Sequence, residues 1–160
     1  MTDYGGSTTP KSERDRWQTP IEIFNAIDLE FGFWLDAAAS ENNALCAHYL
    51  TESDNALNSD WRSYGAIWCN PPYSDIGSWV DKAAEQCRAQ RQPVVMLLPA
   101  DISTGWFSSA LESADELRMI TGGRIQFVPV SDTGKRQSNP KGSVLFIWRP
   151  FTKPRHIITL

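Results

Sequence analysis

Short apolar runs alternate along the chain with stretches in which apolar residues recur at helical spacing. Runs of apolar and β-branched residues predict strands at 33–36, 49–51, 66–69, 93–98, 117–120 and 144–148. Apolar residues three and four positions apart predict helices over 76–87, around 106–111 and, after a stretch of small residues, over 44–47. Strands that alternate with helices are typical of an α/β fold with an open, mostly parallel sheet.

A further helix is predicted near the start of the chain. Thr19 is a suitable N-cap, Pro20 suits the first turn, and Glu22 would complete a capping box. The apolar side of this helix is expected to end at Phe31, because Gly32 is a typical helix terminator.

Polar segments set the expected boundaries. Residues 1–16 are rich in Gly, Ser, Thr and charge, and are expected to form a flexible N-terminal tail. Residues 129–142 contain two prolines and two glycines and are expected to be an exposed substrate or specificity loop. Since the chain has 160 residues and no internal repeat, we expect 17–160 to form one domain.

Composition and charge limit the possible partners. The formal net charge is −4, so binding to a nucleic acid would depend on a local basic patch. No apolar run is long enough to cross a membrane. The three cysteines lack the spacing of metal ligands or of a disulfide framework, which predicts buried thiols, no metal and a reducing cytoplasm. The candidate phosphate-binding cations are Arg124, Lys135, Arg136 and Lys141, with Lys153 and Arg155 beyond them.

The tetrapeptide Asn70-Pro71-Pro72-Tyr73 directly follows a predicted buried strand. Both prolines have a fixed φ and no N–H, so this corner presents carbonyl oxygens at the carboxyl edge of the sheet. The Asn70 side-chain oxygen and the following main-chain carbonyl can accept two hydrogen bonds from one planar amino group. Tyr73 can stack on the ring that carries this group. The pattern therefore predicts a site where an –NH2 group acts as a nucleophile.

Carboxylates accompany the neighbouring strands, and ligands of open α/β sheets bind at the carboxyl ends of strands. Asp36 ends the first strand, where it would face the cationic tail of a ligand. Asp54, or Glu52 close to it, would accept the hydroxyls of a ribose. Asp60 would accept from an adenine amino group while Trp61 covers the purine. Together these groups fit S-adenosylmethionine, an adenosyl nucleoside with a cationic tail.

Short stretches that match a known protein family occur in the same order over nearly all of the chain beyond the tail. They are Trp17–Pro20, Phe31–Phe33, Leu35–Ala39, Asn42–Ala44, Asp54–Leu57, Asp60–Trp61, Asn70–Tyr73, Leu97–Ala100, Trp106–Phe107 and Gly123–Phe127. With this set the chain resembles the phage-type DNA N6-adenine methyltransferase (Dam) family.

The resemblance implies a Rossmann-like methyltransferase fold, S-adenosylmethionine as methyl donor and adenine N6 in DNA as acceptor. It makes Asn70 to Tyr73 the catalytic corner, and it assigns Thr19 and Pro20, after Trp17, to the methionine end of the cofactor. Ala37 and Ala38 follow the acid of the first strand, where methyltransferases often have glycines. Alanine adopts positive φ less readily than glycine, which affects how the backbone there approaches the cofactor.

The expected mechanism is direct in-line transfer to a base that is flipped out of the duplex, with Tyr73 as its stacking partner. The corner by itself would also suit cytosine N4, an RNA adenine or a glutamine amide of a protein. An inactive cofactor-binding or nucleic-acid-binding module is the non-enzymatic alternative.

Overall fold

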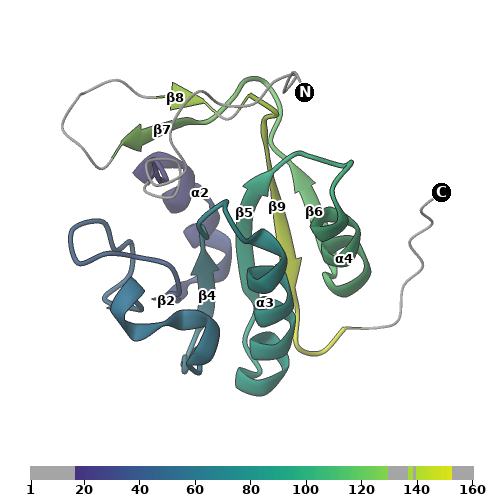
Figure 1. Cartoon of the computed structure of the whole chain (residues 1–160). Coiled ribbons are helices and arrows are strands. Elements are labelled where there is room, and N and C mark those ends of the chain that lie inside the picture. Colours follow the sequence, from purple (N-terminus) through teal and green to yellow (C-terminus); the bar gives the residue numbers. More distant parts are fainter. Residues whose placement is uncertain (1–16, 130–136, 139, 153–160) are drawn as a thin grey trace.

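The computed structural model describes residues 17–129, 137–138 and 140–152, which are built around a six-stranded sheet (Figure 1). The strands lie in the order β3 (His48–Tyr49), β2 (Phe33–Asp36), β4 (Ala66–Cys69), β5 (Val94–Pro99), β9 (Ser143–Trp148) and β6 (Glu116–Met119). Strands β3, β2, β4 and β5 pair in parallel, whereas β9 is antiparallel to both of its neighbours. The mostly parallel α/β sheet predicted from the sequence is confirmed.

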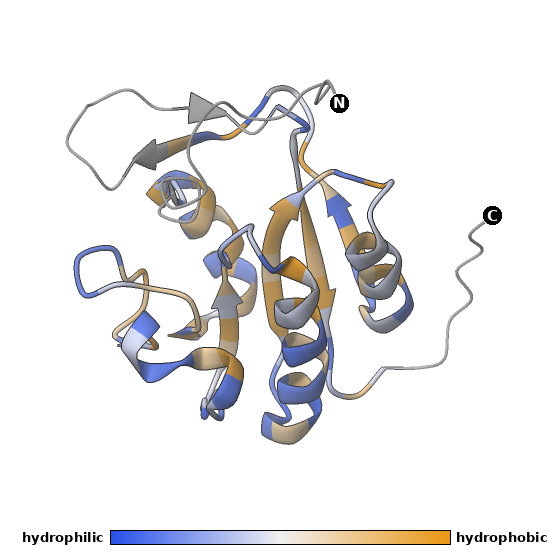
Figure 2. Cartoon of the chain, in the orientation of Figure 1, coloured by the Kyte–Doolittle hydropathy of each residue, from blue (hydrophilic) through white to orange (hydrophobic). Residues whose placement is uncertain are grey.

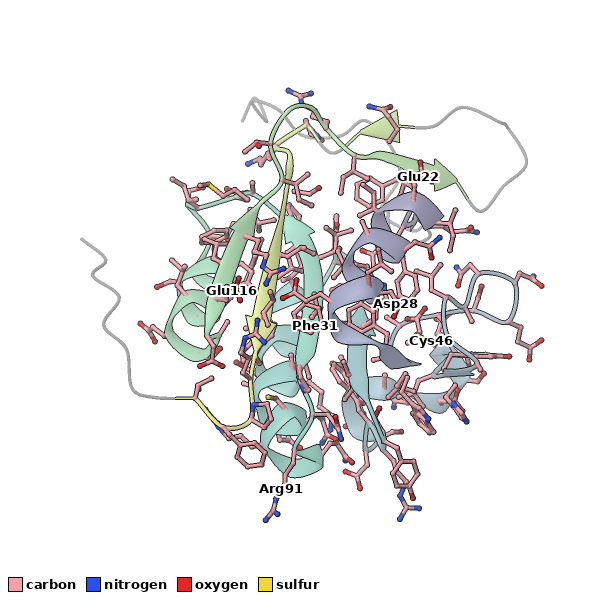
Figure 3. The ribbon with its side chains drawn as sticks, turned by 180° about the vertical axis from the view of Figure 1, so that it is seen from behind. Glu22, Asp28, Phe31, Cys46, Arg91 and Glu116 are labelled. Carbon is pink, nitrogen blue, oxygen red and sulfur yellow. The ribbon has the colours of Figure 1, made fainter. Side chains whose placement is uncertain are left out.

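Helices cover both faces of this sheet. The helices α3 (Ile76–Gln90) and α4 (Gly105–Ser113) pack on one face, and α2 (Ile21–Phe31) packs on the other (Figures 1 and 3). Alternate residues of β5 point to opposite faces of the sheet: Met96 packs in the hydrophobic cluster under α3 and α4, and Val95 packs in the cluster under α2. Strand β5 is accordingly coloured as hydrophobic in Figure 2, and all four residues of β4 are buried, as expected for strands covered on both sides.

A second, three-stranded antiparallel sheet was not predicted. It has the order β1 (Trp17–Gln18), β7 (Gln126–Pro129) and β8 (Gln137–Ser138). Figure 1 shows β7 and β8 beyond the carboxyl ends of the parallel strands. The predicted loop 129–142 thus begins in β7 and includes β8, while its residues 130–136 and 139 lie outside the described residues, as does the predicted tail 1–16.

Two local predictions were wrong. Helix α2 has Pro20 as its N-cap, with no hydrogen bond from a capping side chain, so Thr19 does not cap the helix. Residues 44–47 are not helical, because the chain turns there and the Leu45 N–H donates to the Asp36 carboxylate instead of to a helical carbonyl. The predicted helix end is confirmed: Gly32 adopts the left-handed conformation with φ 64°.

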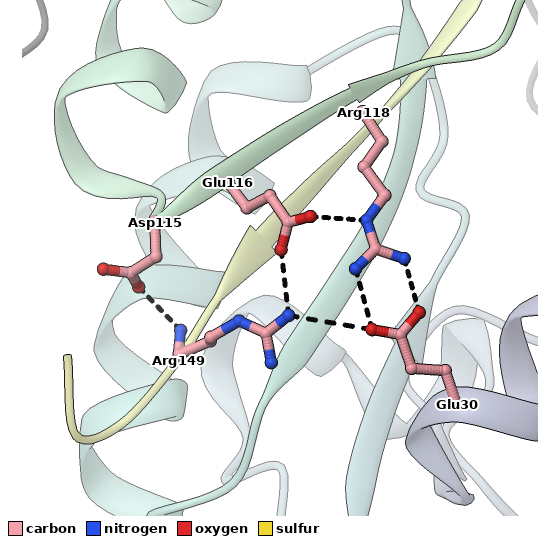
Figure 4. A network of polar contacts seen from close by, with 5 residues as sticks. All are labelled: Glu30, Asp115, Glu116, Arg118 and Arg149. Atoms are coloured by element: carbon pink, nitrogen blue, oxygen red, sulfur yellow. Dashed lines mark hydrogen bonds and ion pairs between the residues drawn. The ribbon is translucent and has the colours of Figure 1, made fainter.

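Charged side chains fasten the C-terminal end of α2 to β6 (Figure 4). Arg118 donates two hydrogen bonds to the Glu30 carboxylate and one to Glu116, which also accepts from Arg149. Both guanidinium groups lie 5.3–5.6 Å from the centre of the Phe31 ring. Hydrogen bonds from Arg118 lower the pKa of both Glu30 and Glu116, so the network is fully charged at neutral pH.

A buried glutamine holds the crossover between β3 and β4. This crossover contains two short 3₁₀ turns, η1 (Glu52–Asp54) and η2 (Ala56–Asn58). The Gln86 side-chain oxygen on α3 accepts the Trp61 main-chain N–H at 2.8 Å, and the Trp61 indole N–H donates to the Ala56 carbonyl at 2.9 Å. Since an unsatisfied buried N–H costs about 1–3 kcal/mol, these bonds fix the path of the crossover against α3.

The thiols are free, and Cys69 and Cys87 are buried as predicted. Burial raises the pKa of Cys87 to about 11 and that of Cys46 to about 12, so both thiols stay protonated at neutral pH. Within the described ranges, no three His, Cys, Asp or Glu side chains are grouped to hold a metal ion. None of the helices described here is long and apolar enough to span a membrane.

Candidate functional site

The ends of β2 and β4 bring two of the predicted site residues to one edge of the sheet. Asp36 is the last residue of β2 and pairs in register with Trp68, while Asn70 directly follows β4. The Ala37 N–H donates to the Trp68 carbonyl at 2.9 Å, which continues the pairing past the end of β2. The carboxyl ends of the two strands are therefore adjacent.

A threonine from a distant segment holds the Asn70 side chain. The Asn70 amide nitrogen, Nδ2, donates to the Thr19 hydroxyl oxygen at 3.0 Å. Thr19 is only 7% exposed, and it lies between β1 and α2. The sequence pattern assigned this hydroxyl to a helix cap and to the cofactor segment, so its contact with Asn70 was not foreseen.

The rest of the corner is partly enclosed. Pro71 is buried, whereas Pro72 and Tyr73 are half-buried. The Tyr73 ring packs against the core cluster under α3 and α4. Its hydroxyl oxygen is buried and has no hydrogen-bond partner within the described part of the chain. Burial, and to a lesser degree the neighbouring Cys69, raises the pKa of Tyr73 well above its ordinary value, so the hydroxyl stays neutral.

Asp36 organises the loop that follows β2. The residue is 3% exposed, and its carboxylate accepts hydrogen bonds from the Ala38 N–H at 3.2 Å and the Leu45 N–H at 3.1 Å. Burial raises the pKa of Asp36 to about 6, and the two hydrogen bonds oppose this rise. None of residues 37–40 has a positive φ, so alanines in place of glycines do not strain this loop.

The acids after β3 are on the surface. The Asp54 carboxylate accepts from the Thr51 N–H at 2.7 Å and from its hydroxyl at 2.9 Å, and these bonds lower the pKa of Asp54. Glu52 and Asp60 are exposed as well.

Trp61 requires a correction. It is 0% exposed and belongs to the core cluster beside Trp79, so its indole has no open face on which a purine could lie. The sequence suggested that this aromatic side chain contacts the ligand, but its burial against α3 makes it part of the core.

Two of the predicted cations are described. Arg124 is exposed just before β7. Lys141 forms an ion pair of 2.8 Å with Asp101, which follows β5 at the same edge of the sheet. Asp101 was not predicted, although an acid after an apolar run is the pattern that singled out Asp36. Lys135 and Arg136 lie outside the described residues.

Comparison with known proteins decides the family. Residues 6–160 match the family described as DNA N-6-adenine-methyltransferase (Dam). The chain belongs to this family. The resemblance read from the ordered stretches is thereby confirmed, and the sheet order is consistent with the fold of a Dam-family methyltransferase.

Phage proteins of the Dam family are similar over most of the chain. A DNA N-6-adenine-methyltransferase of Escherichia phage T1 is 39% identical over 162 residues, which cover 91% of this chain and 67% of the phage protein. A DNA N-6-adenine-methyltransferase of Haemophilus phage HP1 is 35% identical over 146 residues, covering 90% of this chain and 84% of the relative.

The buried Tyr73 hydroxyl generates a stability prediction. Replacing Tyr73 with Phe removes a polar group that is desolvated without a partner, while the ring and its packing remain. We expect Tyr73→Phe to raise the free energy of unfolding by about 1 kcal/mol, as measured by urea denaturation.

Tyr64→Phe is the matched control, because Tyr64 is 76% exposed and its hydroxyl can reach water. This variant should change stability by less than about 0.5 kcal/mol. A loss of stability in Tyr73→Phe would show that the Tyr73 hydroxyl is satisfied in solution.

Proposed function

We propose that this chain transfers a methyl group from S-adenosylmethionine to the N6 amino group of adenine in DNA, with Asn70, Pro71, Pro72 and Tyr73 as the catalytic corner. The observation that carries the proposal is the place of Asn70. In a chain of the Dam family, its amide lies at the carboxyl edge of the sheet beside Asp36 and is held by a buried hydroxyl.

The corner suits an amino group as nucleophile. Asn70 Oδ1 and the Pro71 carbonyl oxygen can each accept one N–H of the adenine amino group. Two such bonds orient the nitrogen and increase its electron density. Holding the reacting nitrogen in place lowers the barrier by several kcal/mol, as in other reactions between preoriented partners. No covalent intermediate with the protein is needed, and the surplus proton leaves after transfer.

The cofactor supplies the electrophilic methyl group, and the residues at this edge have the chemistry to hold it. Asp36 offers a buried carboxylate for a cationic tail, and the backbone of Ala37 and Ala38 lies beside it. The exposed acids after β3 remain the candidates for the ribose, with Asp54 favoured and Glu52 as the alternative. Asp60 remains the candidate acceptor for the adenine amino group of the cofactor, and the family pattern assigns the methionine end to Thr19 and Pro20, after Trp17, beside Asn70.

DNA is the second substrate in this proposal. A stacked base cannot reach an enclosed corner, so the adenine would be flipped out of the duplex and stacked against the Tyr73 ring. Arg124 and Lys141 are the described cations assigned to the phosphates, and Lys135 and Arg136 remain predictions for the same role. Their contribution would weaken steeply as salt concentration rises.

Substitution of Asn70 tests the catalytic assignment. Asn70→Ala removes one of the two acceptors for the amino group, and we expect it to lower kcat by at least about 100-fold, as for other preoriented hydrogen-bonding groups. The measurement is transfer of labelled methyl from S-adenosylmethionine to DNA, followed by mass spectrometry of the nucleosides. The wild-type product should be N6-methyladenine.

Asn25→Ala serves as the matched control, because Asn25 is exposed on α2. It should keep wild-type kcat, and Asn70→Ala should still bind the cofactor. Full turnover by Asn70→Ala would refute the role of the corner. Labelling of cytosine, RNA or protein instead of DNA adenine would refute the acceptor.

The raised pKa of Asp36 predicts a pH dependence of cofactor binding. A cationic tail binds the carboxylate form, so affinity should be highest near pH 7 and fall as pH drops through about 6. Cys46 and Cys69 face Asp36, and burial keeps both thiols protonated over this range, so they add no titration there.

Calorimetric titration of S-adenosylmethionine between pH 5 and 8 would measure this dependence, with the affinity approaching a tenfold loss per pH unit on the acid side. Adenosine, which lacks the cationic tail, is the control ligand and should show a weaker slope. Equal slopes for the two ligands would contradict a contact between Asp36 and the tail.

A further inference from the structure

The hydrogen bond between Asn70 and Thr19 affects whether the oxygen or the nitrogen of the Asn70 amide faces the substrate. An asparagine side chain carries an acceptor oxygen and a donor –NH2 group on a terminal bond with two nearly equivalent rotations. A target amino group only donates at this point. It therefore needs the oxygen, and an amide rotated by half a turn would place one –NH2 group against another.

Thr19 satisfies the nitrogen end of the amide. With Nδ2 donating to the Thr19 hydroxyl at 3.0 Å, Oδ1 occupies the other terminal position of the same amide. Because Thr19 is only 7% exposed, little water can reach this position to replace its hydroxyl. An amide nitrogen that loses its buried acceptor pays a desolvation cost, which would disfavour the productive rotation.

The surrounding packing fixes where the Thr19 hydroxyl lies. On one side of Thr19, Gln18 of β1 pairs with Val128 of β7. On the other side begins α2, whose Phe24 packs edge-on against Trp68 of β4 at 5.5 Å between ring centroids. Since Trp68 lies in β4 two residues before Asn70, the packing of α2 on β4 brings the Thr19 and Asn70 side chains together.

We propose that Thr19 is a positioning residue for methyl transfer, which orients the Asn70 amide so that Oδ1 faces the adenine amino group. This inference rests on the proposed catalytic role of Asn70. It assigns the Thr19 hydroxyl a role in the chemical step, in addition to any contribution of the segment 17–20 to cofactor binding. The helix-cap role expected from the sequence is excluded, because no side chain caps α2.

The test compares two substitutions at position 19, with a third in reserve. Thr19→Val keeps the shape and removes the hydroxyl, and Thr19→Ser keeps the hydroxyl. We expect kcat at saturating cofactor and DNA to fall roughly 3- to 10-fold in Thr19→Val, the range of one net hydrogen bond, and to stay within twofold of wild type in Thr19→Ser. If Thr19→Val does not fold, Thr19→Ala replaces it in the comparison with Thr19→Ser.

Ser63→Ala is the control for loss of a buried hydroxyl. Ser63 is 6% exposed and donates to the Gly65 carbonyl at 2.7 Å, before the amino end of β4 and thus away from the corner. It should keep wild-type kcat even if its stability falls.

The outcomes separate the two proposals. Full kcat in Thr19→Val at saturating cofactor, or an equal loss in Thr19→Ser, would overturn the positioning role, since a contribution to cofactor binding alone is overcome by saturation. If Asn70→Ala also kept full turnover, the catalytic assignment of the corner itself would fail. A fall in kcat for Asn70→Ala without a fall for Thr19→Val would refute the positioning role of Thr19 and leave the catalytic role of Asn70 standing.

Discussion

Burial of both faces of β4 and β5 is the constraint on which the rest of the structure depends. The strands are parallel and almost wholly apolar, so they need a helical layer on each side. Phe24 of α2 supplies one side through its contact with Trp68, and removal of a buried phenylalanine of this kind typically costs about 3–5 kcal/mol. Within the sheet that these layers cover, β2 and β4 pair in parallel, so their last residues lie at the same edge. The proposed site is therefore a consequence of how the core is covered.

Local patterns were sufficient to predict the central strands, the main helices and the position of Asn70 directly after a strand, because each depends on consecutive residues or on helical spacing. The second sheet was missed because β1 has two residues and gains its partner only through the long-range pairing of Trp17 with Pro129. Thr19 fits a helix cap equally well by local rules, and only the packed structure shows its hydroxyl against Asn70. Trp61 was misassigned for a similar reason, because local sequence does not distinguish an aromatic residue that contacts a ligand from one that packs in the core.

Two buried polar groups near the proposed site lower the stability of the folded protein. Asp36 carries a carboxylate into a nearly closed position, where two backbone N–H groups only partly offset the cost of burial. Tyr73 holds a buried hydroxyl for which the described residues offer no partner. Costs of this kind gather at functional sites because binding or chemistry, rather than folding, makes use of the groups. At the far end of α2, by contrast, Glu30 and Arg118 are fully paired, which keeps the helix in place over β4.

The central claim is that the Asn70–Tyr73 corner faces a bound methyl donor. A crystal structure with S-adenosylhomocysteine, the demethylated donor, tests it most directly. The account predicts the ligand sulfur beside the Asn70 side chain and the Pro71 carbonyl, with the amino-acid tail toward Asp36. A ligand bound at another edge of the sheet, or with its sulfur turned away from Asn70, would contradict the account.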